Sequence, residues 1–325
     1  MPAPIRRVDE LGFPLPAAFA DHPDAPPRSK RTWGQLIYRW RWSLLLLLLP
    51  LLFGDSLIHG VRQAIAQRML RNAQIHYFQN RLPEALASTD RALFWEPNTF
   101  DQWEAYQYRA LIFEGMPKHA QESFDAWTEV IKRLEDPQRA KQYSDELRLA
   151  YSERASVGER IGRHRDAIAD ATIAVKLANN DRSRAETLNG RAYMRALANL
   201  ELDRALEDVD ESLRIVPGDA NVIDTRAYVL FRLGKYDQAR KDIDDAIRRL
   251  TGSPAGGFWF GPDNGPHIRA QDEEASINFR ANQDALAVMY HHRGEIRKKQ
   301  GQAEQGEKDF RKAEMLGYDP DRGIN

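Results

Sequence analysis

The chain has 325 residues, with 47 basic and 48 acidic side chains and no cysteine. A formal net charge of -1 argues against a nucleic-acid-binding protein that acts through a global basic field, and the missing cysteines exclude disulfides, thiolate metal sites and a cysteine nucleophile. A mean hydropathy of -0.62 excludes a protein with many membrane spans but leaves room for one.

Residues 1–32 are rich in proline, and seven of the 17 prolines of the chain lie in this segment. Proline lacks a backbone N–H and fixes φ, so such a segment cannot propagate a helix or a strand ladder. We expect an extended, largely disordered tail, with a proline-rich docking ligand as the alternative.

An apolar, aromatic segment follows over residues 33–61. Its charge-free stretch at 42–54 includes six consecutive leucines at 44–49, which cover every face of a helix, whereas a surface helix needs only one apolar stripe. This stretch has 13 residues, fewer than the ~20 that span a bilayer, but extension to residue 61 reaches 20 and adds only Asp55 and His59. We therefore expect one transmembrane helix that acts as a signal anchor. A cleaved secretory signal and an ordinary buried helix are the alternatives.

The flanks of this segment predict its orientation. Five basic residues lie between positions 28 and 41 with no acidic residue among them, against three on the other flank (Arg62, Arg68 and Arg71). This excess of positive charge predicts a cytoplasmic N-terminus, with the rest of the chain on the far side of the membrane, periplasmic or extracytoplasmic. Tryptophan and tyrosine prefer the membrane–water interface. The candidates for that position are Trp33, Tyr38, Trp40 and Trp42.

From residue 62 onward, small residues recur in pairs that are seven positions apart, which is two turns along one helix face. The pairs are Ala85 and Ala92, Ala167 and Ala174, Ala205 and Ser212, and Ala239 and Ala246. A second helical stretch precedes each pair, as at 225–234, where Gly234 suits a left-handed turn into the next helix. Each unit is therefore predicted to be a helical hairpin whose small residues let its two helices approach closely.

This pattern resembles the tetratricopeptide repeat, which has a period of 34 residues and small residues at positions 8, 20 and 27. The copy at 220–251 matches best, with Ala227, Gly234, Tyr236, Ala239 and Ala246 in the expected places. Copies at 66–99 and 287–320 also match, although Gly306 replaces an alanine in the latter, and a copy near 186–218 is longer by about three residues. Residues 100–137 are helical and aromatic but off-register, a degenerate copy at best.

The resemblance implies an all-α fold, a right-handed solenoid of helical hairpins that stacks into one elongated domain. We expect the helical repeat array at 62–250 and a C-terminal repeat and tail at 287–325. Between them, residues 251–286 form a non-repeat insert whose glycines and prolines predict a long loop. Its adjacent aromatic residues either plug the solenoid locally or form a binding loop that caps the groove or touches the membrane. They are Phe258, Trp259 and Phe260.

The sequence contains none of the motifs that mark common catalytic sites: no phosphate-binding G-x-x-x-x-G-K-[ST], no G-x-S-x-G and no H-E-x-x-H. His291, His292 and Glu295 come nearest to a metal cluster, but only His291 and Glu295 share a helix face. We expect no enzymatic activity, no cofactor and no metal, and neither a nucleic acid nor a small-molecule substrate as partner.

For a tetratricopeptide-type solenoid, the resemblance implies that protein or peptide partners bind in a concave groove lined by the first helix of each hairpin. Matching the family's groove positions (2, 5, 9, 12 and 13) nominates residues in three copies. They are Asn221, Asp224, Tyr228, Phe231 and Arg232 in the best copy, Arg191 and Arg195 in the preceding one, and His291, Glu295 and Lys299 in the last. Arginines beside aromatic rings predict an acidic ligand.

Two functions follow from these expectations. The first is a membrane-anchored protein–protein interaction scaffold, which contacts the bilayer through residues 33–61 and binds partners in the groove. The alternative is a structural subunit that braces a larger membrane-associated complex. An apolar patch on the convex side would favour the brace, and a polar groove would favour the scaffold.

Overall fold

The computed structural model describes residues 56, 58–95, 102–136, 140–251, 259–260, 266–267 and 273–318, and nearly all of them are α-helical. The part from Arg62 onward forms one compact unit. No helix within these described ranges has the length and apolar character needed to cross a membrane. The predicted interface residues Trp33, Tyr38, Trp40 and Trp42 lie outside them.

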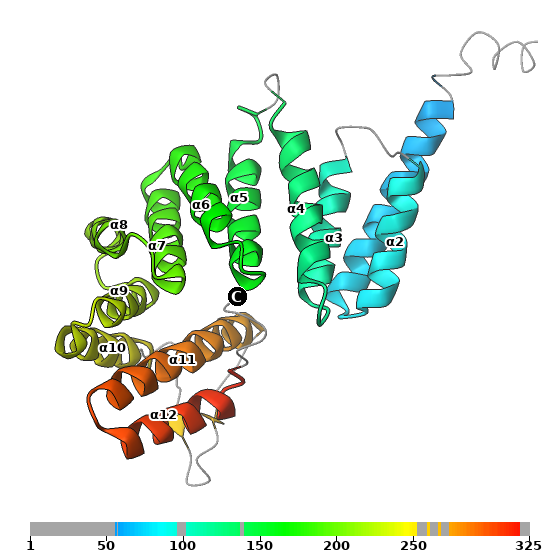
Figure 1. The fold of residues 1–325 in the computed structure, drawn as a ribbon. Helices are drawn as coiled ribbons and strands as arrows, with labels where there is room; N and C mark the ends of the chain where they lie inside the picture. The colour runs from blue at the N-terminus through cyan, green and yellow to red at the C-terminus, as the bar shows by residue number, and fades with distance from the viewer. Residues whose placement is uncertain are drawn as a thin grey trace, which may run out of the picture. The chain divides into compact units, whose positions relative to one another are not determined.

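The elements of this unit are α-helices and one pair of short strands (Figure 1). After a helix over residues 62–78, they are α2 (Leu82–Trp95), α3 (Trp103–Glu114), α4 (Ala120–Leu134), α5 (Ser144–Arg160), α6 (His164–Leu177), α7 (Asp181–Ala198), α8 (Leu202–Ile215), α9 (Ala220–Arg232), α10 (Tyr236–Thr251), β1 (Trp259–Phe260), β2 (Pro266–His267), α11 (Glu273–Lys299) and α12 (Ala303–Met315).

The helices pack as hairpins: α3 with α4, α5 with α6, α7 with α8, α9 with α10 and α11 with α12. Each second helix from α4 to α10 also contacts the first helix of the next hairpin. The first helices α5, α7, α9 and α11 contact one another in turn and lie on one side of the stack (Figure 1). The predicted all-α helical-repeat solenoid is confirmed, and its first helices share one face.

The small residues of the repeat lie where paired helices meet. Seven alanines among them are fully buried, namely Ala73, Ala85, Ala192, Ala205, Ala227, Ala239 and Ala246, and so is Ser212. The turn between α9 and α10 places Gly234 at a φ of 76°, so the predicted left-handed glycine is confirmed. In the last hairpin, a Cβ on Gly306 would lie 2.9 Å from the Gly294 carbonyl oxygen. Glycine replaces alanine there because α11 and α12 approach too closely for a side chain.

Gly306→Ala is expected to lower the free energy of unfolding by about 1–3 kcal/mol, because the added methyl group overpacks the contact between α11 and α12. Gly190→Ala in α7 is the matched control, because a Cβ there meets no atom within 4 Å. That control is expected to gain about 0.5–1 kcal/mol, since alanine is the better helix former. Urea denaturation followed by circular dichroism measures both, and a Gly306→Ala variant at least as stable as wild type would contradict the close approach.

The insert is shorter than the predicted 251–286, because α11 already begins at Glu273. The glycines and prolines end at Pro266, and the stretch from Glu273 onward contains neither residue until Gly294, so nothing there opposes a helix. Within the insert, β1 and β2 pair antiparallel, with Trp259 opposite His267. Phe258 lies outside the described residues, and a binding role for Phe258, Trp259 and Phe260 stays a prediction.

The off-register segment at 100–137 contains a complete hairpin, α3 and α4. Ala110 and Ser123 are fully buried and occupy the first two small positions. The third position, seven residues after Ser123, holds Val130, which is also buried and packs in one core cluster with Trp127. A larger side chain at this position hides the repeat from a search for small residues.

Candidate functional site

Three consecutive first helices each contribute an aromatic ring to one cluster. Tyr193 comes from α7, Tyr228 from α9 and His292 from α11. Tyr228 stacks on His292 with ring centroids 4.3 Å apart, and Tyr193 lies 5.9 Å from Tyr228 and 6.2 Å from His292. The hydroxyl of Tyr193 is buried and has no hydrogen-bond partner among the described residues. This cluster joins three hairpins on the shared face.

Asp224 anchors the cluster from the first half of α9. Its Oδ1 lies 2.9 Å from His292 Nδ1, and both side chains are at least nine-tenths buried. Burial alone lowers the pKa of His292, but attraction to Asp224, their hydrogen bond and the nearby Glu295 raise the pKa above its ordinary value. The bond therefore ties α11 to α9 as a buried ion pair when the imidazole is protonated.

Groups of both signs surround these rings. Arg232 of α9 donates from Nη1 to the Tyr228 hydroxyl at 3.4 Å and from Nε to Asn199 Oδ1 at 3.4 Å. Burial raises the pKa of Glu295, while His292, Arg232 and Lys299 oppose that shift. Lys299 is exposed at the end of α11. Arg232, Glu295 and Lys299 therefore form a rim around the rings, in which a half-buried carboxylate lies beside two cations.

His291 packs against residues of its own hairpin, and its Nε2 lies 3.9 Å from Oε2 of Glu295, one turn along α11. Its ring stacks on Tyr318 with centroids 4.2 Å apart and lies 5.2 Å from Phe310. Burial, followed by repulsion from His292, lowers the pKa of His291 to about 4. Within the described residues, no group of three histidine, aspartate or glutamate side chains is arranged to hold a metal ion.

The two adjacent histidines are expected to titrate on opposite sides of the ordinary histidine pKa of about 6.5. The stabilising contribution of His292 is complete below about pH 6.5 and is lost as pH rises through its raised folded pKa. The contribution of neutral His291 is lost as pH falls from about 6.5 towards its folded pKa of about 4. Imidazole NMR titration, assigned with His291→Gln and His292→Gln variants, measures both. A higher pKa for His291 than for His292 would contradict this geometry.

Arg191 and Arg195 do not face this cluster, which corrects the orientation predicted for them. Arg191 donates two hydrogen bonds to Asp208 of α8, at 2.7 and 2.6 Å, and Arg195 binds both Asp208 and Glu201. The copy is one residue longer than the best copy, because Ala192 and Ala205 are 13 positions apart where Ala227 and Ala239 are 12 apart. The predicted three extra residues misplaced the register of α7.

The pairing of Arg191 with Asp208 recurs in four hairpins. In each, an arginine directly before the small residue of the first helix donates two hydrogen bonds to an aspartate three residues after the small residue of the second helix. The pairs are Arg154 and Asp170, Arg191 and Asp208, Arg226 and Asp242, and Arg293 and Asp309. We call these the hairpin clamps. The sequence carries the signal, R-[AG] followed by [AG]-x-x-D, which our sequence analysis missed.

Some clamp arginines also reach the preceding hairpin. Arg226 lies 3.4 Å from Asp210 of α8, and Arg293 lies 3.0 Å from Asp244 of α10. Arg154 donates to Thr128 of α4 at 3.3 Å. The clamps therefore fix both the angle within a hairpin and the stacking of one hairpin on the next.

The remaining nominated residues divide by exposure. Asn221 is exposed in the first turn of α9, whereas Phe231 is half-buried and packs against Tyr228 and Tyr236. A further titratable group that the sequence did not nominate lies on the first helix α5. Burial, and then repulsion from Glu114, raises the pKa of Glu153 to about 7.

Comparison with known proteins supports the architecture. No protein-family model matches the chain, and no curated protein matches it. A tetratricopeptide repeat protein from Parabacteroides merdae ATCC 43184 has a TM-score of 0.51 and 17% sequence identity, with coverage of 79% of this chain and 95% of that chain. PilW, described as a widely conserved type IV pilus biogenesis factor, has a TM-score of 0.49 and 14% identity, with coverage of 75% and 90%.

YrrB, described as a TPR protein with an unusual peptide-binding site, has a TM-score of 0.45 and 18% identity and covers 61% of this chain and 91% of its own. At these identities the likeness concerns the fold alone. We base it on the Parabacteroides protein, whose TM-score is 0.51. The tetratricopeptide-type solenoid thus stands on both the repeat pattern and this structural likeness.

Proposed function

We propose that this protein is an interaction scaffold that binds a partner protein or peptide along the shared face of its first helices. The observation that best supports this proposal is the cluster of Tyr193, Tyr228 and His292, to which three consecutive hairpins contribute. The cluster contains a buried tyrosine hydroxyl without a partner among the described residues, and charged groups of both signs surround it. Stacked hairpins offer such extended surfaces to partners. The proposal involves no catalytic step, cofactor or metal.

The nominated residues take different parts in this proposal. Arg232, Glu295 and Lys299 would contact the partner, together with the exposed Asn221, and the buried Tyr228 would support them from beneath. Asp224 and His291 would support the face, because their side chains are already held by His292 and Tyr318. Arg191 and Arg195 are left out, because both bind Asp208.

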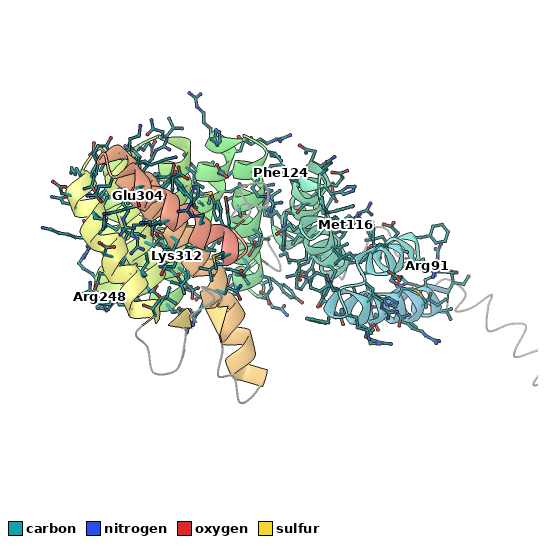
Figure 2. The ribbon with its side chains drawn as sticks, turned by 90° about the horizontal axis from the view of Figure 1, so that it is seen from below. Arg91, Met116, Phe124, Arg248, Glu304 and Lys312 are labelled. Carbon is teal, nitrogen blue, oxygen red and sulfur yellow. The ribbon has the colours of Figure 1, made fainter. Side chains whose placement is uncertain are left out.

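The second helices favour the scaffold over the structural brace. Among the described residues, the inner second helices α4, α6, α8 and α10 expose no large apolar side chain, whereas α2 exposes Phe94 and α12 exposes Met315. The inner second helices instead carry exposed charged groups such as Arg248, whose side chain is 71% exposed, and Glu304 at the start of α12 is exposed as well (Figure 2). A brace would need an apolar patch on this side.

Charge reversal on the rim tests the scaffold. Full-length protein carrying Arg232→Glu and Lys299→Glu would be crosslinked in membranes, solubilised in detergent and co-purified beside wild type, with Arg248→Glu on α10 as the matched control. We expect the rim variant to change the recovery of a specific set of partners and the control to leave it unchanged. Equal recovery from the rim variant and the control would refute this binding face.

We also propose that residues 33–61 tether the scaffold to a membrane, with the N-terminus in the cytoplasm. The leucine run at 44–49 and the basic flank at 28–41 support this part. Fractionation with carbonate extraction, followed by protease treatment of intact spheroplasts, tests it. Release of the protein by carbonate, or protection of the repeat array from external protease, would refute the tether or its orientation.

A further inference from the structure

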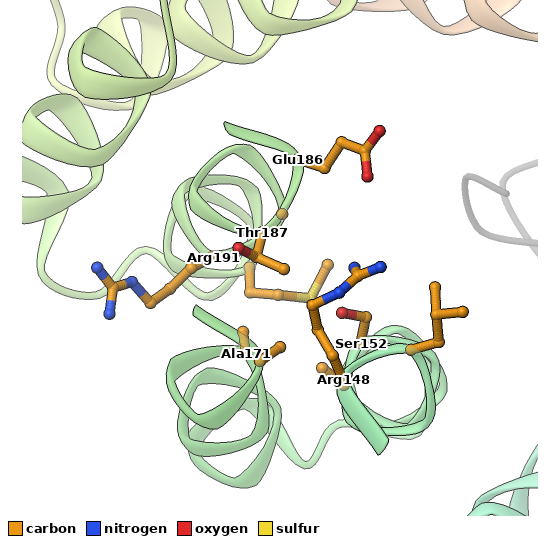
Figure 3. Close-up of a pocket in the computed structure, with 11 residues that line it drawn as sticks. Arg148, Ser152, Ala171, Glu186, Thr187 and Arg191 are labelled. Atoms are coloured by element: carbon orange, nitrogen blue, oxygen red, sulfur yellow. The ribbon is translucent and has the colours of Figure 1, made fainter. Parts of the chain in front are cut away.

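A cavity of about 200 Å³ lies between α5, α6 and α7, in a different part of the array from the aromatic cluster (Figure 3). Its walls are mainly apolar and come from all three helices. They include Leu149, Ala155, Ala171, Ala174 and Met194. A cavity of about 150 Å³ in another protein accommodates benzene, so this volume suits one aliphatic side chain.

Gly190 forms part of the wall and has no structural reason to be glycine. It lies inside α7, where glycine is less favourable than alanine, and a Cβ added there meets no atom within 4 Å. By contrast, a Cβ on Gly158 would meet Phe124 at 3.2 Å, and Gly294 is similarly crowded by Phe310. The missing side chain of Gly190 therefore keeps the cavity open rather than relieving a contact.

Arg148 supplies a cation that the fold leaves incompletely satisfied. Its side chain lines the cavity and is only 11% exposed, and its Nε is buried without a hydrogen-bond partner among the described residues. Its nearest acid, Asp145, lies 3.7 Å away and is mostly exposed, and Asn179 also donates to that carboxylate. Buried guanidinium groups are normally hydrogen-bonded, so the Nε–H of Arg148 is a donor available for a ligand.

The other charged groups around the cavity are already engaged. Arg191 extends away from the cavity (Figure 3), towards its clamp partner Asp208. Glu186 on the rim is paired with Arg182 at 3.0 Å. Arg148 is therefore the cation on this wall that best suits an incoming carboxylate.

We infer that this cavity binds a partner peptide by enclosing one aliphatic side chain and pairing Arg148 with the carboxylate of a neighbouring aspartate or glutamate in that peptide. This inference rests on the proposed function and names the chemistry of the partner. Leu149 and Ser152 hold repeat positions 2 and 5, on the same face as the aromatic cluster further along the array. A segment that contacts both sites continues past the cavity, so an acidic side chain supplies the carboxylate rather than a chain terminus.

Selection of a phage-displayed random peptide library on the full-length protein in detergent tests this inference. Recovered peptides would be resynthesised with amidated C-termini and measured by fluorescence polarisation. We expect an aliphatic residue next to aspartate or glutamate among them, and a loss of affinity of about ten-fold or more when Gly190→Met fills the cavity. Arg148→Met should cause a similar loss, and so should glutamate-to-glutamine exchange in the peptide.

Gly190→Ala is the matched control, because its methyl group occupies little of the cavity and should leave affinity near that of wild type. Melting curves of all variants establish that each is folded. Peptides that lack the aliphatic–acidic pair and bind Gly190→Met as well as wild type would overturn this inference and leave the scaffold standing. Binding that requires a free C-terminus would also overturn it. Recovery of no peptide on wild type would overturn the inference and the proposed peptide-binding function together.

Discussion

Asp208→Ala is expected to lower the free energy of unfolding by about 3–5 kcal/mol, because it leaves two largely buried guanidinium groups without their shared carboxylate. Asp208 accepts two hydrogen bonds from Arg191 and a further one from Arg195, and the side chains of Asp208 and Arg195 are at least nine-tenths buried. Glu201 reaches Arg195 from the turn and is itself 43% exposed, so it replaces only part of this pairing.

Asp210→Ala is the control on the same helix. Asp210 is 51% exposed and lies 3.4 Å from Arg226, so its loss is expected to change stability by about 1 kcal/mol or less. Urea denaturation of both variants, with hydrogen exchange to locate the loss in α7 and α8, makes the comparison. Similar effects of the two substitutions would show that the hairpin clamp is not a structural element.

Trp127→Ala is expected to cost about 3–5 kcal/mol, because it removes one of the largest fully buried side chains from the second hairpin. The indole Nε1 also donates to Glu114 Oε1 at 2.7 Å, joining α4 to the end of α3. Hydrogen exchange should place the loss in these two helices, because solenoid hairpins are stabilised by their nearest neighbours.

Trp127→Phe separates packing from hydrogen bonding. It retains most of the apolar contact and loses the donor to Glu114, so we expect a smaller cost of about 1.5–3 kcal/mol. Glu114 would still accept from Ser123 at 3.1 Å. If the phenylalanine and alanine variants were equally unstable, the hydrogen bond rather than packing would dominate this core.

Most of the architecture was predictable, because its signals are local. Small residues seven positions apart mark a helix face, and Gly234 marks a turn, without any knowledge of distant contacts. The failures had local causes too. Val130 in place of a small residue hid the hairpin of α3 and α4, and the glycine-rich loop was extended past Pro266 over residues that form α11.

The candidate site was predictable only in part. Repeat positions nominated Asp224, Tyr228 and Glu295, and in the structure these residues lie near one another, while their binding role stays a prediction. The same repeat positions placed Arg191 and Arg195 on the wrong side of α7. An error in the length of one copy shifts the repeat position given to each residue and so changes the helix face on which it is expected. Tyr193 holds the same repeat position as Tyr228 and was missed for the same reason.

By itself, the sequence determined that this protein is a stack of helical hairpins, because periodicity and turn chemistry act within a few residues. It also supplied the leucine-rich segment and its basic flank, on which the proposed tether rests. The tertiary structure was needed to find which charges are paired, because the partners of Arg191 and Arg226 lie 17 and 16 residues away on another helix. The sequence signal of the hairpin clamps can be recognised once these pairs are known. The tertiary structure was also needed to find the cavity beside Gly190, since an empty volume exists only when three helices are placed around it.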